Sequence, residues 1–148
     1  MILHETDMPR GTLYVYTGKV TIDEHLSRQK EPAFVLPNMI VTTGRQYLIN
    51  TGPLTDINIV KLGDDGTARS LGLIDLVSPQ FTAGPTDIRI SGTQIIIELF
   101  VGVEEANFIH REIGLFAGEV LISTLKVVPE FEKTTAKTRT YLYTLGWD

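Results

Sequence analysis

Hydrophobic and polar residues alternate along much of this chain, and the alternation predicts β-strands. Runs of this kind cover residues 12–17, 57–62, 95–103, 120–128 and 137–147. In the first run, Leu13 and Val15 face opposite to Tyr14 and Tyr16. In the last run, one face carries Tyr141, Tyr143, Leu145 and Trp147. Strands of this length between glycine and proline turns favour an antiparallel sheet or a small β-sandwich.

Two short helices interrupt this pattern. Thr21 and Glu24 have the spacing of a capping box, which predicts a helix over residues 22–28 that ends before Pro32. Residues 43–50 predict a second helix, which Thr42 or Thr43 caps and which Gly52-Pro53 ends. We therefore expect a mainly β (β-rich α+β) fold, with one or two short helices and an N-terminal arm.

The composition agrees with a folded, strand-rich domain. The chain has 148 residues, of which 43% are hydrophobic and 21% are charged. Thr, Ile and Val together account for 44 residues, and β-branched side chains suit a pleated, half-buried surface. This length allows one domain, or one domain plus an arm.

Residues 1–38 differ from the rest of the chain, because they hold three of the seven prolines and most of their charges alternate in sign. They form either a surface hairpin with a helical turn or an arm that wraps a neighbouring subunit. If they form an arm, we expect the deletion of residues 1–36 to preserve folding and to abolish assembly. We place the domain boundary between this segment and a β domain over residues 39–148.

Charge and composition exclude several classes of protein. The net charge of −5 is concentrated between residues 39 and 118, which opposes binding to a phosphate backbone, so no nucleic-acid partner is expected. The absence of cysteine excludes disulfides and thiolate sites. No signal peptide is found, and no apolar run approaches the ~20 residues that span a bilayer. We expect synthesis in the cytoplasm and no membrane association.

Candidate catalytic and metal-binding residues are sparse. His4, His25 and His110 stand alone, without the spacing of paired metal ligands. Glu104 and Glu105 are neighbours that would point to opposite faces of a strand, so a turn explains them better than acid–base chemistry. The sequence Gly63-Asp64-Asp65-Gly66 predicts a turn rather than a calcium loop. We therefore expect no enzyme, no metal and no cofactor.

The face formed by Lys137, Arg139, Tyr141 and Tyr143 has two interpretations. It is either a surface that stacks nucleic-acid bases between cations, or a strand with an exposed charged end and a buried aromatic end. We favour the second interpretation.

One string of residues is specific. The segment Arg111-Glu112-Ile113-Gly114-Leu115-Phe116 closely resembles the R-E-[IL]-G-L-F motif of phage tail-collar and tail-fibre proteins. Other landmarks follow in that family's order: Gly44-Arg45 with Tyr47-Leu48, the strand that runs into Gly63–Gly66, the turn and strand after Gly118, Lys133-Thr134, and the closing strand with Trp147. The resemblance covers residues 39–148.

From the residues alone, Ile113, Leu115 and Phe116 would anchor the motif in the core, and Gly114 would allow a bend or close approach of the backbone. Arg111 and Glu112 would face oppositely and bind different partners, on this subunit or another. Candidate inter-subunit contacts are Arg45, Tyr14 and Tyr16.

The resemblance implies a structural virion protein. In many relatives this region opens a longer chain with a fibre shaft, whereas this chain ends at Asp148. An adaptor, collar or baseplate component is therefore expected. The implied partners are further copies of the chain, with a trimer favoured, and other tail or baseplate proteins, including a tail fibre. The alternative is a small lectin-like module that stacks sugars on Trp147, Tyr141, Tyr143 and Tyr47.

Overall fold

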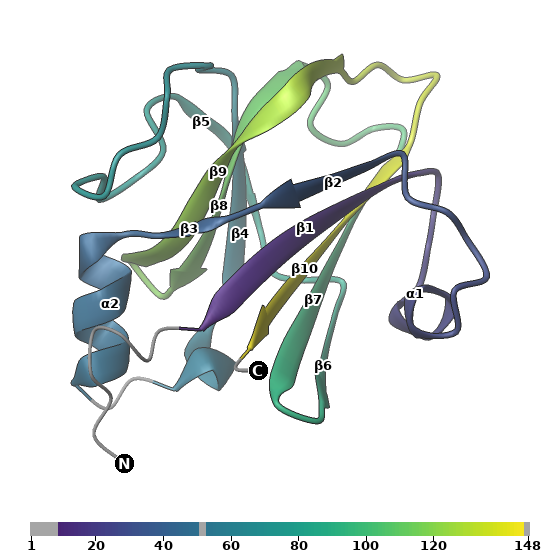
Figure 1. The fold of residues 1–148 in the computed structure, drawn as a ribbon. Helices are drawn as coiled ribbons and strands as arrows, with labels where there is room; N and C mark the ends of the chain where they lie inside the picture. Colours follow the sequence, from purple (N-terminus) through teal and green to yellow (C-terminus); the bar gives the residue numbers. More distant parts are fainter. Residues whose placement is uncertain (1–8, 51–52, 147–148) are drawn as a thin grey trace.

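The computed structural model describes residues 9–50 and 53–146, and its fold is mainly β, as expected. Two antiparallel five-stranded sheets face each other (Figure 1). Sheet A consists, in order, of β2 (Phe34–Pro37), β1 (Arg10–Thr17), β10 (Arg139–Gly146), β7 (Gln94–Val101) and β6 (Asp87–Ser91). Sheet B consists of β3 (Met39–Ile40), β9 (Val120–Glu132), β8 (Ile109–Ala117), β4 (Ile59–Gly63) and β5 (Pro79–Ala83).

The main hydrophobic core lies between the two sheets. Sheet A contributes Leu13, Ile97 and Tyr143, and sheet B contributes Leu62 and Ile113, among others. The predicted alternation is confirmed in β10, because Tyr141, Tyr143 and Leu145 all belong to this core. Trp147 lies outside the described residues.

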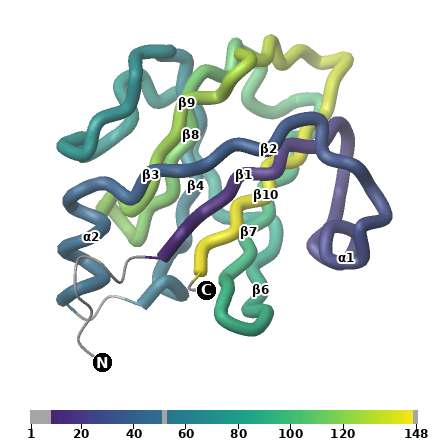
Figure 2. Tube along the Cα trace, in the orientation of Figure 1, coloured from purple at the N-terminus to yellow at the C-terminus, as the bar shows by residue number. Residues whose placement is uncertain are grey.

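The N-terminal segment is part of this core, so the predicted boundary at residue 38 is not a structural boundary. β1 lies between β2 and β10, and its register joins Arg10 to Gly146 and Thr17 to Arg139. Leu13 and Val15 point into the main core. The expectation of an arm underestimated this segment, because its few apolar residues complete a core whose other members are distant in sequence. Figure 2 shows the chain from β1 to β3 running along both sheets.

Helix α1 (Ile22–Leu26) covers the outer face of sheet A. The predicted capping box is present, with the Thr21 side chain accepting from the Glu24 N–H and the Glu24 side chain accepting from the Thr21 N–H. Ile22 packs there against Tyr16, Ile96 and Leu142 in a second cluster. β10 is buried on both faces, because the main core covers its inner face and the cluster around Ile22 covers its outer face.

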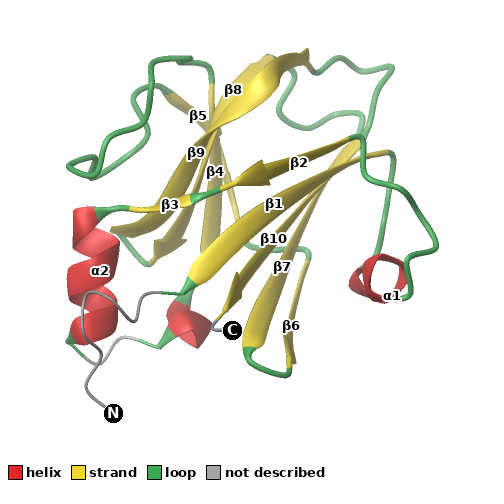
Figure 3. Ribbon diagram, in the orientation of Figure 1, coloured by secondary structure: helices red, strands yellow, loops and turns green. Residues whose placement is uncertain are grey.

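Helix α2 (Thr42–Ile49) packs against β9, and the short 3-10 helix Leu54–Asp56 follows it (Figure 3). The N-cap of α2 is Val41 and not a threonine. Thr43 Oγ1 instead donates to the carbonyl oxygen of Leu121. Residues 51 and 52, which include the predicted glycine stop, lie outside the described residues. The C-cap is Asn50.

The end of β9 differs from the prediction. The sequence places a stop at Pro129, but β9 continues to Glu132. The proline is accommodated because the pairing of β9 with β8 shifts there: His110 is paired with Phe131 and Glu112 with Lys126, so residues 127–130 bulge opposite Arg111. β7 also differs from the prediction, because it ends at Val101 and not at residue 103. Glu104 and Glu105 lie in the turn that follows, as predicted.

Candidate functional site

The motif residues 111–116 form the middle of β8, between β9 and β4. Ile113 and Leu115 are fully buried in the main core, in agreement with their expected role as anchors. Phe116 packs in a separate cluster with Val41 and Leu121, and the Lys61 ammonium lies 4.3 Å from the centre of its ring. The apolar half of the motif therefore fixes β8 on both of its faces.

The carboxylate of Glu112 is fully buried and accepts hydrogen bonds on both oxygens. Oε1 accepts from Nη1 of Arg69 at 2.6 Å and from the backbone N–H of Val77 at 2.9 Å. Oε2 accepts from the backbone N–H groups of Ser78 at 2.8 Å and Asp65 at 3.1 Å. A buried charge is tolerated when its lone pairs are satisfied in this way.

All of these donors belong to one connection, residues 64–78, which joins β4 to β5. We call it the β4–β5 loop. The Arg69 side chain is 4% exposed, so the ion pair with Glu112 is shielded from solvent. The donors lie at the start, middle and end of the loop, so the single carboxylate of Glu112 fixes the loop at these three places.

Two glycines make room for this arrangement. A Cβ on Gly63 would lie 2.4 Å from Oε2 of Glu112 and 2.5 Å from the carbonyl oxygen of Ser78. A Cβ on Gly114 would lie 3.0 Å from Cδ2 of Leu76, within the same loop. Gly114 thus allows the close approach that the sequence suggested, and Gly63 allows the carboxylate to reach the loop.

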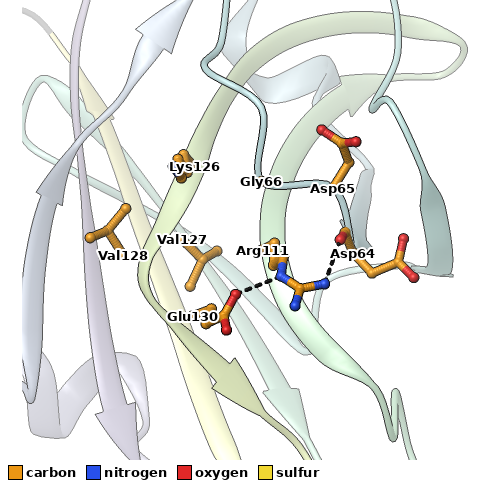
Figure 4. Close-up of a pocket in the computed structure, with 8 residues that line it drawn as sticks. All are labelled: Asp64, Asp65, Gly66, Arg111, Lys126, Val127, Val128 and Glu130. Carbon is orange, nitrogen blue, oxygen red and sulfur yellow. Dashed lines mark hydrogen bonds and ion pairs between the residues drawn. The ribbon is translucent and has the colours of Figure 1, made fainter.

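Arg111 borders a pocket of about 560 Å³ (Figure 4). The bulge in β9 forms one wall and the start of the β4–β5 loop forms the other. Nε of Arg111 donates to Oε2 of Glu130 at 2.5 Å, and Nη1 donates to the carbonyl oxygen of Asp64 at 3.1 Å. The hydrogen bond to Glu130 is the main reason that the pKa of Arg111 is raised. The lining residues are Asp64, Asp65, Gly66, Arg111, Lys126, Val127, Val128 and Glu130.

Arg111 and Glu112 bind different partners, as expected, but those partners are on their own chain. Arg111 joins the loop to β9, and Glu112 joins the loop to β8. Asp65 accepts the backbone N–H of Thr67 at 2.8 Å, which is the geometry of a turn. Among the described residues, no cluster of three or more potential ligands could hold a metal ion. The contacts of Arg111 and Glu112 fix the β4–β5 loop.

The three candidate inter-subunit contacts are located away from this site. Nε of Arg45 donates to the carbonyl oxygen of Ile40 at 3.2 Å. The Tyr16 side chain is buried, and its hydroxyl lies 2.7 Å from Nδ1 of His25. The Tyr14 ring packs on the same histidine with 4.6 Å between the ring centres. These residues make contacts within one chain, between β1 and α1 or beside α2.

The aromatic residues considered for sugar stacking are mostly inaccessible. Tyr141 and Tyr143 are 1% and 2% exposed, so neither ring offers a face to a ligand. Burial raises the pKa of both hydroxyl groups. The Tyr47 hydroxyl donates to Asp56, and Trp147 lies outside the described residues.

Sequence reasoning missed a buried polar cluster beside the end of β9. His110 is fully buried; its Nε2 donates to the carbonyl oxygen of Ala106 at 2.8 Å, and its Nδ1 lies 2.7 Å from the Tyr141 hydroxyl. Burial lowers the pKa of His110 to about 4. Arg139 is 4% exposed, with its guanidinium 3.9 Å from the Phe131 ring. The expectation that this charged strand end is exposed is met by Lys137, which precedes β10, but is wrong for Arg139, because aromatic rings cover its guanidinium.

Within the chain as described, no helix is long and apolar enough to cross a bilayer. No family model, no curated protein and no solved structure matches the chain.

Proposed function

We propose that this protein is a structural component of the tail of a phage or a phage-tail-like particle. It acts as an adaptor, collar or baseplate component that connects the tail to fibres or to a neighbouring ring. Its location is the virion, and its partners are further copies of itself, in a trimer by the resemblance, and other tail proteins. The motif Arg111–Phe116 is the source of the proposal.

The observation that supports it best is how the motif is used. Glu112 binds the β4–β5 loop through buried hydrogen bonds. Three aliphatic side chains of the same loop are exposed to solvent. Leu71, Ile74 and Val77 are 45%, 71% and 51% exposed. Several exposed apolar residues on one fixed loop are typical of a protein-binding surface.

The mechanism is binding and geometry, without turnover. A loop that is already fixed loses little conformational freedom when a partner binds, so more of the contact energy remains as affinity. Obligate interfaces of this kind commonly bury more than ~2,000 Å². The loop would form the centre of such an interface, and the mixed charges around Arg111 would form part of its polar rim.

The test is incorporation into particles. A tagged chain, expressed in the source organism, should co-purify with tail-like particles through a density gradient, and gold labelling should mark one level of the tail in electron micrographs. Ile74→Asp should reduce incorporation at least tenfold. Val103→Asp is the matched control, since Val103 is 45% exposed on another loop. Absence of the wild-type chain from purified particles would refute the proposal, and normal incorporation of Ile74→Asp would refute the role of the loop.

A further inference from the structure

The edges of the two sheets are protected to different degrees. β3 has two residues, β2 has four and contains Pro37, and β5 begins at Pro79 and pairs with β4 through a register shift. Shortness, proline and irregular pairing all prevent an edge from recruiting another strand. β6, the remaining edge among the described residues, has none of them: its five residues pair with β7 in continuous register.

The outer edge of β6 also has unpaired backbone groups. The hairpin closes through the two-residue turn Gly92-Thr93, with Gly92 at φ 61°. In such a hairpin the flanking residues Ser91 and Gln94 form a hydrogen-bonded pair, and hydrogen-bonded pairs alternate along the ladder. The N–H and C=O groups of Ile88 and Ile90 therefore point away from β7, toward the open edge.

The side chains of the same two residues are exposed. Ile88 and Ile90 are paired with Ile97 and Ile95, which belong to the main core, so all four side chains lie on the inner face of sheet A. Ile95 and Ile97 are buried, whereas Ile88 and Ile90 are 39% and 64% exposed. The apolar inner face thus continues to the edge of the sheet without cover.

We infer that β6 pairs with β6 of a second copy of this chain. The two strands run antiparallel about a two-fold axis, with Ile88 opposite Ile88 of the other copy. This contact joins the two five-stranded sheets A into one continuous sheet. It adds a contact that the proposed function does not require.

Charge complementarity identifies the partner and the register. With Ile88 opposite its counterpart, Asp87 of each copy lies opposite Arg89 of the other, which gives two cross-strand pairs of opposite charge. The next register that matches the outward N–H groups places Arg89 opposite Arg89, and like charges in that position are destabilising. The segment Asp87–Arg89 is therefore complementary to itself in only one of these two registers.

Arg89 is exposed enough to reach a second copy of the chain. Its guanidinium contacts Asp23 and Asp87 of its own chain, and its side chain remains 37% exposed. The contact is isologous, so it produces an even number of copies. It is compatible with the proposed trimer, since a two-fold and a three-fold contact on different surfaces combine to six copies.

Light scattering behind a sizing column tests the inference over a concentration series. The wild-type chain should have a mass of two or six times 16.5 kDa. Ile88→Lys and Ile90→Lys should each halve that mass, which converts a dimer to a monomer or six copies to a trimer. Val103→Lys, an equivalent change at an exposed position outside both β6 and the β4–β5 loop, should leave the mass unchanged. A wild-type monomer or trimer at all concentrations would overturn the inference, as would a mass that both β6 variants retain.

A charge exchange tests the register without changing an apolar residue. Asp87→Arg alone and Arg89→Asp alone should each weaken self-association at least tenfold, because each places like charges opposite one another. The double variant D87R/R89D should restore it. Failure of the double variant to recover, with an unchanged circular dichroism spectrum, would contradict the pairing. None of these results depends on particle incorporation, so this inference and the proposed function can fail separately.

Discussion

At the scale of single residues, the motif is a set of contacts that fix one loop. Glu112 accepts from Arg69 and from three backbone N–H groups, and Gly63 provides the space in which the carboxylate lies. Because the ion pair is buried, its two members depend on each other. Removing one of them leaves a charge without solvent or partner.

Glu112→Gln should therefore destabilise the protein strongly. We expect the free energy of unfolding to fall by about 3–5 kcal/mol, since Arg69 keeps its charge and loses its buried counter-ion. Urea unfolding followed by circular dichroism measures this change. Glu130→Gln is the matched control: Glu130 pairs with Arg111, but its side chain is 57% exposed, and the expected loss is below about 1 kcal/mol. Equal effects of the two variants would contradict a special role for Glu112.

His110 should make stability depend on pH. Its pKa is lowered by burial from 6.5 to about 4, so between these values the unfolded chain binds a proton that the folded chain does not. Stability from this residue is therefore complete above pH 6.5 and is lost as the pH falls toward 4, by about 3 kcal/mol in all.

Urea unfolding at several pH values tests this expectation against the variant His110→Gln. The variant should be less stable at pH 7, and its stability should vary less between pH 6.5 and 4. Parallel pH profiles for the two proteins would show that His110 does not titrate as expected.

At the scale of elements, β1 is the clearest correction to the sequence analysis. It occupies an interior position in sheet A and contributes Leu13 and Val15 to the main core. A segment that is short and rich in proline and charge nevertheless completes a sheet, because β10 and β2 supply the neighbours that it needs.

Deleting residues 1–36 should therefore abolish folding, and not only assembly. The deletion exposes one edge of β10 and removes Ile22 from the outer face of sheet A. We expect no cooperative transition in thermal unfolding followed by circular dichroism. A deletion of residues 1–8, which removes none of the described strands, is the control. A cooperative transition in the longer deletion would restore the model of a detachable arm.

Much of the fold was predictable from local pattern. The alternation in β1 and β10, the capping box at Thr21 and the turn at Glu104 all depend on neighbours in sequence, and the structure confirms them. The continuation of β9 past Pro129 was not predictable, because it depends on the shifted pairing with β8. The edge strand β2 was also missed, since the sequence of Phe34–Pro37 has no alternation of hydrophobic and polar residues.

The candidate site was predictable only in part. The motif locates Glu112 and Arg111, and Phe116 and its neighbours are apolar enough to indicate burial. The partner Arg69 lies 43 residues away in sequence, and no local pattern connects the two. The same holds for His110 and Tyr141, because their contact exists only once the two sheets are assembled.

At the scale of the whole molecule, the two sheets form one unit because the chain crosses between them at both sides. β2 and β3 are separated by Asn38 alone, and β5 and β6 by residues 84–86. The β4–β5 loop and β6 lie at opposite corners of the molecule (Figure 1). A copy held through β6 can therefore present its loop to a different partner.

The pairing of Arg10 with Gly146 has a mechanical consequence. Both ends of the described chain leave the same end of sheet A, on two strands that are paired with each other. Tension applied to these ends would pull across the strands, along the direction of the hydrogen bonds, and would open the pairs between β1 and β10 one after another. A load spread across the loop and the β6 edge would instead act on many contacts at once. Force on this protein is therefore better carried through its side surfaces than through the ends of the described chain.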